Sequence, residues 1–593
     1  MLKFLKYTLA VITGTFVGLL MFFIVFGIVV VSIVAIAMSE EKSNDIKENS
    51  VLVIKLDQPI LEKAPTNPFK NFSFLSMATD QTLGLNDILD NIHNAKYDSK
   101  IHCILLNIGY IQASYETVEE IRDALIDFKK SGKFIIAYSD YYAQSAYYLS
   151  SVANKVYMNP EGILEFRGIS SQLIFLKNTF EKLGIKPEPI RHGKYKGAIE
   201  MFANDKMSNE NREQHQVFVD AVWKHVISEI GESRHIKPSD LNRMADSLLV
   251  RNGDLAFKYK LLDSLKYYDQ IIAQIKDSLH IAKKDKVPSV QLSDYIESHS
   301  KDKEDALNSS TKIAVVIAQG DIMPGMGDDN NIGSEKYARL FRDLRNDTTV
   351  KVIVFRLNTG GGSSLASESI WREVSLTARE KPVVISMGDY CASGGYYVAC
   401  PGVELLANPL TLTGSIGVYG LLFDASKMLE NVGISTDIVK TNKYSDIGTV
   451  TRALSPFEEG VIRREVDLTY QKFVEHVSKG RKLSQLFVDS IGQGRIWSGK
   501  DALRLRLIDK LGGLTDAIKI ASEKAKLGNS YDVAYYPKEE SAIEAIMQGF
   551  KSKMQEDKIT EYFGDYKDYF EAFKQLNKQH GLQMKLPYVL KME

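Results

Sequence analysis

The sequence is poor in cysteine: its 593 residues include only three, Cys103, Cys391 and Cys400. Three thiols are too few for a disulfide scaffold or for a zinc cluster built on cysteine ligands. Because the number is odd, at least one thiol has no disulfide partner within the chain. The sequence therefore predicts neither a disulfide framework nor a metal site.

An excess of charge of one sign is also absent. The 74 Lys+Arg residues balance 75 Asp+Glu residues, which leaves a net charge of −1. This balance argues against DNA or RNA as a partner, because nucleic-acid-binding proteins usually carry a basic surface. The apolar fraction of 44% and the charged fraction of 25% exclude a disordered or collagen-like chain. The length predicts about three to five domains, or a few large ones.

Long apolar runs are missing after the first 40 residues. Residues 8–38 carry no charge and exceed the roughly 20 helical residues that a bilayer core requires. We expect them to form an uncleaved transmembrane anchor, with a cleaved signal peptide as the alternative. Lys3 and Lys6 precede the run, so residues 1–7 are expected in the cytoplasm. The expected location is the inner membrane, with a single span and a periplasmic or otherwise extracytoplasmic body.

The rest of the sequence contains an internal repeat. Residues 143–149 (AQSAYYL) resemble residues 392–398 (ASGGYYV), and the same offset of 249 relates Gly168 to Gly417. Chance similarity would not keep a near-constant offset over so many residues. We therefore expect a first repeat, a linker, a second repeat, and a C-terminal tail that is helical and serves packing or assembly. Their expected ranges are 50–275, 276–311, 312–525 and 526–593, respectively.

Each repeat alternates short β-branched runs with amphipathic stretches. The run VLVIKL at residues 51–56 corresponds to KIAVVIAQ at residues 312–319, and helix-like segments separate such runs in both copies. This alternation predicts βαβ units with a mainly parallel sheet. The expected fold class is therefore α/β, in two tandem copies behind the N-terminal helix.

Small and hydroxyl-bearing residues concentrate in three segments of the second repeat. These are RLNTGGGSS (356–364), MGDYCASGGYYVAC (387–400) and NPLTLTGSIGVYG (408–420). At a strand-to-helix turn, Ser393 would expose its hydroxyl while neighbouring glycine N–H groups could stabilise an oxyanion. The glycine-rich segment lacks the order of a P-loop, and no persuasive dinucleotide-binding pattern follows it. An ordinary glycine-rich turn is the alternative reading.

A serine nucleophile needs a base, and the sequence offers no nearby histidine. None lies between His299 and His476, where the three segments are. A buried lysine with a depressed pKa can serve instead. The first repeat supplies Lys196 within RHGKYKGAIEMF.

The two repeats differ at the positions that matter for this chemistry. The aligned pairs are Lys196 and Ser445, Ser393 and Gln144, and Ser415 and Phe166. The first repeat thus has the lysine and the second has the serines, which predicts one Ser/Lys dyad shared between them. The alternatives are a solvated lysine and a serine kept small for helix packing.

With these motifs, the chain resembles the signal peptide peptidases of the SppA type, in their double-length, membrane-anchored form. The resemblance extends from the anchor to about residue 525 and is most specific in GDYCASGGYYVA, NPLTLTGSIG and GKYKGAIE. It implies a tandem crotonase/Clp-protease-like fold. It also implies a serine endopeptidase that degrades cleaved signal peptides and other apolar, extended peptides. A homotetramer is implied, and no metal or other cofactor.

The resemblance also assigns roles to individual residues. Ser393 would be the nucleophile, Lys196 the general base, Ser415 the residue that orients the lysine, and Gly361 or Gly362 with Gly394 the oxyanion hole. One departure is that residues 359–362 read Thr-Gly-Gly-Gly, where the family commonly has Ser-Pro-Gly-Gly. Gly360 replaces the proline, whereas the two glycines that follow are kept.

Three alternatives stay open at this point. Cys391 could be the nucleophile in place of Ser393, although no activating base for it can be identified. An acyl-CoA enzyme on the same superfamily fold would have similar oxyanion loops but no purpose for a Ser/Lys pair. A non-catalytic membrane scaffold would use the repeats only to bind peptides.

Overall fold

The computed structural model describes residues 2–39, 46–64, 82–328, 330–528, 531–538 and 582–586. The N-terminal helix belongs to one compact unit, and both repeats belong to a second. Helix α1 (Leu2–Ser39) contains the predicted span of residues 8–38. Its residues 6–25 are long and apolar enough to cross a membrane, by length and composition.

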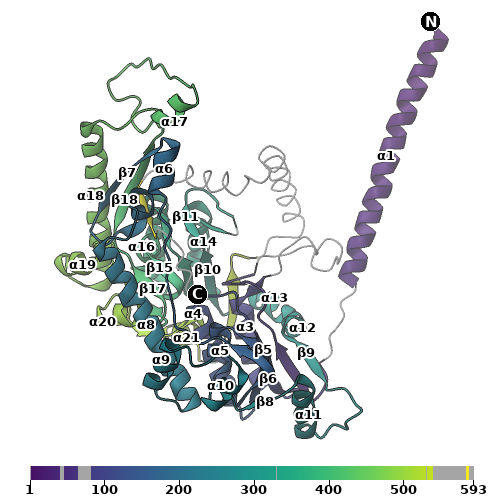
Figure 1. The fold of residues 1–593 in the computed structure, drawn as a ribbon. Coiled ribbons are helices and arrows are strands. Elements are labelled where there is room, and N and C mark those ends of the chain that lie inside the picture. The colour runs from purple at the N-terminus through teal and green to yellow at the C-terminus, as the bar shows by residue number, and fades with distance from the viewer. Residues whose placement is uncertain are drawn as a thin grey trace. The chain divides into compact units, whose positions relative to one another are not determined.

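The first repeat forms a six-stranded sheet in which all neighbouring strands are parallel (Figure 1). The strand order is β8-β6-β5-β4-β1-β9. The strands are β1 (Ser50–Ile54), β4 (Ile101–Asn107), β5 (Phe134–Tyr142), β6 (Lys155–Leu164), β8 (Ser264–Leu265) and β9 (Ser289–Gln291). A separate parallel pair consists of β2 (Ile60–Leu61) and β3 (Leu83–Gly84).

The second repeat builds its sheet in the same order, with the parallel strands β20-β16-β15-β13-β10-β21. These are β10 (Lys312–Gln319), β13 (Val350–Thr359), β15 (Val383–Ala392), β16 (Glu404–Ala407), β20 (Lys510–Leu511) and β21 (Asp532–Tyr536). Two further strands, β17 (Leu412–Gly414) and β19 (Ile496–Ser498), continue from the end of β15. The correspondence of the two sheets confirms the repeat and the α/β class.

Helices cover these sheets because parallel strands are apolar on both faces. Residues Ile88 and Ile121, for example, pack from two helices into the core that contains Leu52 and Leu106. The helices of the first repeat and of the segment after it are α3 (Leu85–Tyr97), α4 (Tyr115–Lys129), α5 (Gln144–Ser150), α6 (Lys177–Leu183), α7 (Glu200–Ala203), α8 (Asn209–Arg234), α9 (Pro238–Asp246), α10 (Gly253–Lys258), α11 (Tyr268–Ser278), α12 (Leu292–Ser298) and α13 (Ser300–Asn308). Those of the second repeat are α14 (Ser334–Asn346), α15 (Ser364–Glu380), α16 (Gly394–Ala399), α17 (Ser426–Asn431), α18 (Pro456–Arg481), α19 (Gln485–Ile491), α20 (Gly499–Arg504) and α21 (Leu514–Ala525).

Both sheets extend beyond the ranges that the sequence suggested for the repeats. Strand β9 lies in the expected linker, residues 276–311, yet it pairs with β1. Strand β21 lies in the expected helical tail, residues 526–593, yet it pairs with β10. The expectation of a helical tail is therefore wrong for β21, and most of the remaining tail lies outside the described residues. Each repeat is completed by a strand that follows its last long helix.

A third sheet combines strands from both repeats, in the order β12-β11-β14-β22-β18-β7. At one edge of this sheet β7, from the first repeat, runs antiparallel beside β18, from the second, over seven residue pairs (Figure 1). The strands are β7 (Lys186–His192), β11 (Asp321–Met323), β12 (Asn331–Gly333), β14 (Gly361–Ser363), β18 (Val418–Asp424) and β22 (Gln583–Lys585). This sheet fixes part of the first repeat against the second.

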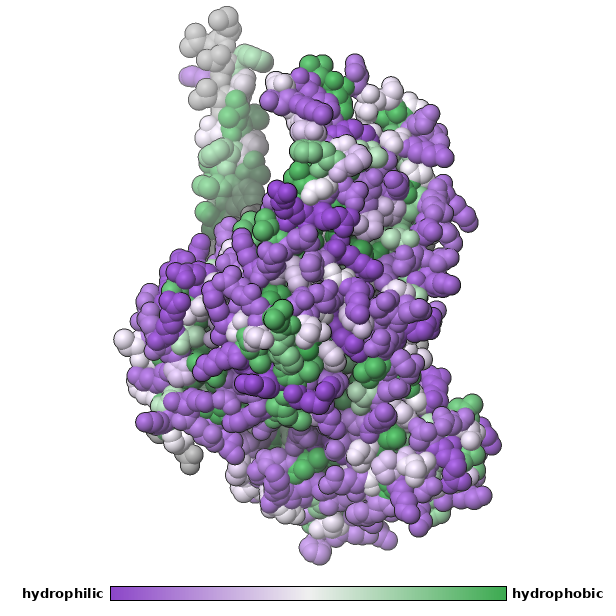
Figure 2. All heavy atoms as spheres, turned by 90° about the vertical axis from the view of Figure 1, so that its left-hand side faces the viewer, coloured by the Kyte–Doolittle hydropathy of each residue, from purple (hydrophilic) through white to green (hydrophobic). Residues whose placement is uncertain are grey.

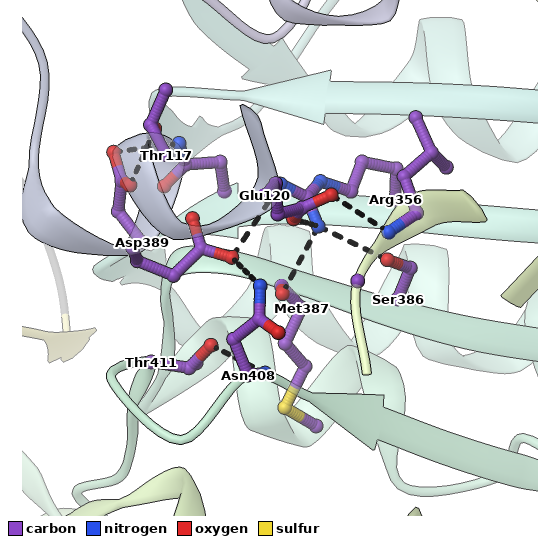
Figure 3. Close-up of polar contacts among 12 residues, drawn as sticks. Thr117, Glu120, Arg356, Ser386, Met387, Asp389, Asn408 and Thr411 are labelled. Atoms are coloured by element: carbon purple, nitrogen blue, oxygen red, sulfur yellow. Dashed lines mark hydrogen bonds and ion pairs between the residues drawn. The ribbon is translucent and has the colours of Figure 1, made fainter. Parts of the chain in front are cut away.

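A buried ionic cluster also joins the repeats (Figure 3). Arg356 on β13 is fully buried and contacts Glu120 of α4, with 2.6 Å between Nη1 and Oε1. It also donates to both carboxylate oxygens of Glu62, at 2.8 and 3.1 Å. Nearby, Thr117 donates to Asp389 across the same boundary. Because β13 leads directly into the glycine-rich segment, this cluster sets that segment against the first repeat.

The face of the body that carries α8, α9, α18 and α19 is mostly hydrophilic (Figure 2). Apolar side chains occur there in small groups between polar and charged ones. Such a surface is typical of protein in contact with water, in contrast to the continuous apolar sequence of α1.

Candidate active site

Ser393 lies at the turn between β15 and α16, as the sequence predicted. Its backbone has φ 55° and ψ −117°, a left-handed conformation that only glycine adopts readily. The strain is on the order of 1–3 kcal/mol, and such strain persists where the surrounding structure enforces it. Here the Ser393 N–H donates to the Gly414 carbonyl at 2.8 Å, which ties the turn to β17.

Lys196 reaches this turn because β7 pairs with β18. It lies just after β7, at the start of a single 3-10 turn, η1 (Gly197–Ile199). The first ladder pair, Val418 with His192, brings the end of β7 beside the loop that contains Ser415. The third sheet therefore places Lys196, a residue of the first repeat, beside the serines of the second repeat.

The lysine amine lies among three oxygen atoms of the second repeat. The distance from Lys196 Nζ is 2.7 Å to Ser393 Oγ, 3.0 Å to Ser415 Oγ and 3.2 Å to the Ser415 carbonyl oxygen. All three residues are at most 1% exposed. The residues that the sequence paired are thus within hydrogen-bonding distance in the structure.

Burial lowers the pKa of Lys196 to about 7, because the charged amine loses its hydration. A substantial fraction of this amine is therefore neutral near pH 7 and can accept a proton. A histidine could also be neutral at this pH and accept the proton. Among the described residues, however, the Ser393 hydroxyl has hydrogen bonds only with the Lys196 amine and the Gly417 carbonyl. The lysine is accordingly the base available to this hydroxyl.

Two glycines, whose role beside the lysine no sequence pattern indicates, make room for its side chain and backbone. A Cβ on Gly494 would lie 2.6–2.7 Å from the backbone and Cβ of Lys196, and the residue has φ 81°. A Cβ on Gly417 would lie 3.2 Å from the Lys196 Cδ. Gly494 follows no repeated motif, although its GQG context marks a tight turn. Both positions need glycine for the lysine to keep this path.

A second missed group holds the backbone next to the lysine. Gln214 of α8 donates to the Tyr195 carbonyl at 3.0 Å and accepts from the Ile496 N–H at 3.1 Å. The Tyr195 N–H donates to the Gln493 carbonyl at 2.9 Å. These bonds fasten the residue before Lys196 to the second repeat. No sequence pattern marks Gln214, because its partners are backbone groups distant in the chain.

The three predicted oxyanion glycines lie together but are not equivalent. The Gly361 N–H donates to Thr359 Oγ1 at 3.0 Å, so it is already engaged. A Cβ on Gly394 would lie 3.1 Å from the Gly362 nitrogen, and a Cβ on Gly361 would lie 2.6 Å from the Gly394 nitrogen. The backbone nitrogens of Gly362 and Gly394 therefore lie near each other, and a side chain on Gly361 would also meet the Met584 carbonyl oxygen, which lies 2.0 Å from where its Cβ would be.

Cys391 lies two residues before Ser393 but is embedded in the apolar core. Burial raises the pKa of its thiol well above the ordinary value, so the reactive thiolate is strongly disfavoured. Its chemistry is therefore that of a small apolar residue.

The sequence profile described as Peptidase family S49 matches two stretches of the chain, residues 127–282 and 375–528. The chain belongs to peptidase family S49. Each match falls within one repeat and its adjoining segment, as expected of a double-length member. The resemblance to SppA-type peptidases is thereby confirmed.

Individual S49 relatives extend over most of the chain. Protease 4 of Salmonella typhi is 33% identical over 477 residues, which cover 79% of this chain and 76% of that protein. The chloroplastic serine protease SPPA of Arabidopsis thaliana is 32% identical, covering 75% and 66%. Protease 4 of Haemophilus influenzae is 29% identical, covering 84% and 83%. The chain is thus a serine protease of the S49 family, which decides against the acyl-CoA enzyme and the scaffold.

Proposed function

We propose that this S49 peptidase hydrolyses peptide bonds with a Ser393/Lys196 dyad assembled between its two repeats. The observation that carries the proposal is the 2.7 Å distance between Lys196 Nζ and Ser393 Oγ in a fully buried setting. A general base must lie within such reach of the proton that it removes.

The reaction follows from this geometry. Neutral Lys196 removes the hydroxyl proton of Ser393 as the oxygen attacks the substrate carbonyl carbon. The tetrahedral intermediate collapses, the C–N bond breaks, and the lysine ammonium returns the proton to the leaving amine. Water then attacks the acyl-serine with Lys196 again as base, which releases the acid and restores the serine.

Ser415 and the glycine amides have supporting roles in this scheme. The Ser415 hydroxyl and carbonyl, 3.0 and 3.2 Å from the amine, would keep the lysine aimed at Ser393. The N–H groups of Gly362 and Gly394 would stabilise the oxyanion, with Gly361 as the spacer between them. Removing one such donor typically lowers kcat by about 10²–10³-fold.

The substrates we propose are cleaved signal peptides and other apolar, extended peptides. The third sheet supports an extended substrate, because its strand β14 contains Gly361 and Gly362 and its strand β18 follows the loop that carries Ser415. We further propose that α1 anchors the protein in the inner membrane, with the N-terminus cytoplasmic and the body periplasmic. We also propose that the protein forms a homotetramer and has no resident cofactor.

A fluorophosphonate probe tests the nucleophile directly. We expect mass spectrometry to find the probe on Ser393, and both labelling and peptide cleavage to be lost in Ser393→Ala and in Lys196→Ala. Ser445→Ala is the matched control, because Ser445 aligns with Lys196 but is exposed. Full activity in Lys196→Ala would remove the lysine from the mechanism, and labelling of Cys391 would reassign the nucleophile.

A further inference from the structure

Arg495 lies beside the candidate active site, immediately before strand β19. Strand β19 pairs antiparallel with β17, and the pair Gly414 with Ile496 brings the residue before β19 next to Ser415. The Ser415 N–H donates to the Arg495 carbonyl at 2.7 Å. The backbone of Arg495 thus holds one of the two serines that surround the lysine amine.

This hydrogen bond matters because the backbone of Ser415 is strained. Its φ of 48° lies in the left-handed region, as does the φ of 55° at Ser393. Such conformations persist only where the surrounding structure enforces them. At Ser393 the enforcing bond is the one to the Gly414 carbonyl. At Ser415 it is the bond to the Arg495 carbonyl.

The side chain of Arg495 holds the residue that precedes the lysine. Its Cζ lies 4.7 Å from the ring centre of Tyr195 and 4.6 Å from that of Trp497. Its Nη1 donates to the Tyr195 hydroxyl at 3.0 Å. A planar guanidinium can stack on aromatic rings and also donate hydrogen bonds in its own plane, which an ammonium cannot do. These contacts join Tyr195 of the first repeat to Trp497 of the second.

The backbone and the side chain of Arg495 therefore hold both sides of the lysine site. Lys196 directly follows Tyr195, and its Nζ lies 3.0 Å from Ser415 Oγ. We propose that Arg495 is a positioning residue that fixes Lys196 relative to Ser415 and so keeps the lysine amine aimed at Ser393. This inference rests on the proposed function, because it takes Lys196 as the base for Ser393.

An ion pair is the remaining side-chain contact described for Arg495. Its Nη2 lies 2.9 Å from Glu213 Oε1, and the Glu213 side chain is 51% exposed. Exposed ion pairs contribute little to stability, because solvent screens the two charges. The stacking and the hydrogen bond to Tyr195, rather than the charge of Arg495, should therefore carry the positioning.

Steady-state cleavage of an apolar peptide by Arg495→Ala is the first test. We expect kcat to fall about 10²-fold with KM unchanged, since a displacement near 1 Å disrupts a positioned base. Arg495→Lys keeps the positive charge but loses the planar stack, so its kcat should fall by a similar factor. Glu213→Ala removes only the exposed ion pair and should match the wild type.

Two outcomes of this series would overturn the proposal. A higher KM with wild-type kcat in Arg495→Ala would make Arg495 a substrate-binding group. Full activity in Arg495→Lys would show that only the positive charge matters.

The pH profile distinguishes positioning from a purely structural role. Loss of the Tyr195 contact should let water reach the Lys196 amine, which restores hydration of its charged form. The apparent pKa of fluorophosphonate labelling at Ser393 should then rise from about 7 toward 10.5 in Arg495→Ala and in Arg495→Lys. A loss of stability alone would reduce the amount of labelled protein without moving this pKa. An unmoved pKa in both variants would reject the positioning role.

Tyr195→Leu reaches the same contact from the other side and remains informative where Arg495→Ala does not fold. It removes the ring and the hydroxyl but keeps an apolar side chain, and it should show the same loss of kcat. The double variant Arg495→Ala/Tyr195→Leu should lose no more than the larger single loss, because both changes break one contact. Wild-type kcat in Tyr195→Leu, or losses that multiply in the double variant, would contradict the proposal.

A stability cycle separates this inference from the proposed function. Lys196→Met should raise Tm at pH 6 in the wild-type background, because it removes a buried ammonium. The gain should be smaller in the Arg495→Ala background, where water reaches the amine. This readout needs no catalysis, so it tests the positioning role even if Ser393 proves not to be the nucleophile. An equal gain in both backgrounds would reject Arg495 as a positioning residue while leaving the dyad intact.

Discussion

The two repeats share a scaffold but differ at the turn where chemistry takes place. In the first, the Tyr147 hydroxyl donates to the Leu261 carbonyl at 2.8 Å. In the second, the Tyr396 hydroxyl donates to the Leu507 carbonyl at 2.7 Å. The tyrosine that anchors the turn is thus used identically in both copies.

The residue at the head of the turn differs in what its side chain does. Gln144 makes four hydrogen bonds of 2.8–3.0 Å, to the Tyr115 hydroxyl and to backbone groups of Arg167 and Gly168. Its counterpart Ser393 has a shorter side chain, and its hydroxyl lies next to the Lys196 amine. One copy is closed by a fully bonded side chain, and the other keeps a strained serine next to a buried amine.

The positions that flank these two residues follow the same division. Phe166, aligned with Ser415, is buried and packs against Tyr147 and Trp223. Ser445, aligned with Lys196, is exposed. The comparison teaches that packed and hydrogen-bonded side chains fill the turn of the first repeat, whereas the turn of the second keeps the serines that meet Lys196 of the first.

The largest effect is expected when the second repeat is given the residue of the first. Ser393→Gln should lower kcat by about 10³-fold or more, because the nucleophile is lost. Gln144→Ser should create no second site, because no lysine lies at residue 445. Steady-state cleavage of an apolar peptide measures both. Fluorophosphonate labelling at position 144 of the Gln144→Ser variant would break the comparison.

Lys196→Met should lower kcat by about 10²–10⁴-fold, the usual contribution of a general base. It should also stabilise the protein, because a buried ammonium is removed. Since the folded pKa of about 7 lies below the ordinary 10.5, wild-type stability rises with pH between these values. The gain from the substitution should therefore be largest below pH 7 and shrink toward pH 10.5.

Thermal denaturation across this pH range measures the gain, and Ser445→Ala, which should change neither activity nor Tm, is the control. A wild-type Tm that exceeds that of Lys196→Met at pH 6 would contradict the prediction that the buried ammonium destabilises the protein.

Arg356 and Leu105, which lie on the corresponding strands β13 and β4, allow a comparison of a buried charged side chain with a buried apolar one. Arg356→Met should cost about 3–5 kcal/mol, because Glu62 and Glu120 lose the cation that compensates them. Leu105→Ala should cost about 2–5 kcal/mol through the cavity that it creates. Adding Glu62→Gln should recover part of the Arg356→Met loss and leave the Leu105→Ala loss unchanged. Denaturant unfolding measures each free energy, and failure of that rescue would refute an ionic origin.

The smallest effect is expected from Gly494→Ala, which adds a methyl group against the Lys196 backbone. We expect kcat to fall about 10²-fold, since a displacement near 1 Å disrupts a positioned base. Gly528→Ala is the control, because that glycine also has positive φ but has open space around it. Equal activity in the two variants would show that Gly494 does not position the lysine.

The sequence predicted the repeat and the Ser393/Lys196 pair because a constant offset aligns positions that differ in chemistry. It could not predict β9 or β22, since strands of three residues are too short to show a periodic pattern. Strand β21 was likewise hidden in a tail that looked helical. Gly494 and Gln214 were missed because their partners are brought together only by the third sheet.

The central claim is that one site is shared between the repeats, with a neutral lysine as its base. The pH dependence of fluorophosphonate labelling at Ser393 tests it most directly. We predict a labelling rate that rises with pH with an apparent pKa of about 7, and that is lost in Lys196→Ala. A rate that persists without Lys196, or that rises only near the ordinary lysine pKa of 10.5, would contradict the claim.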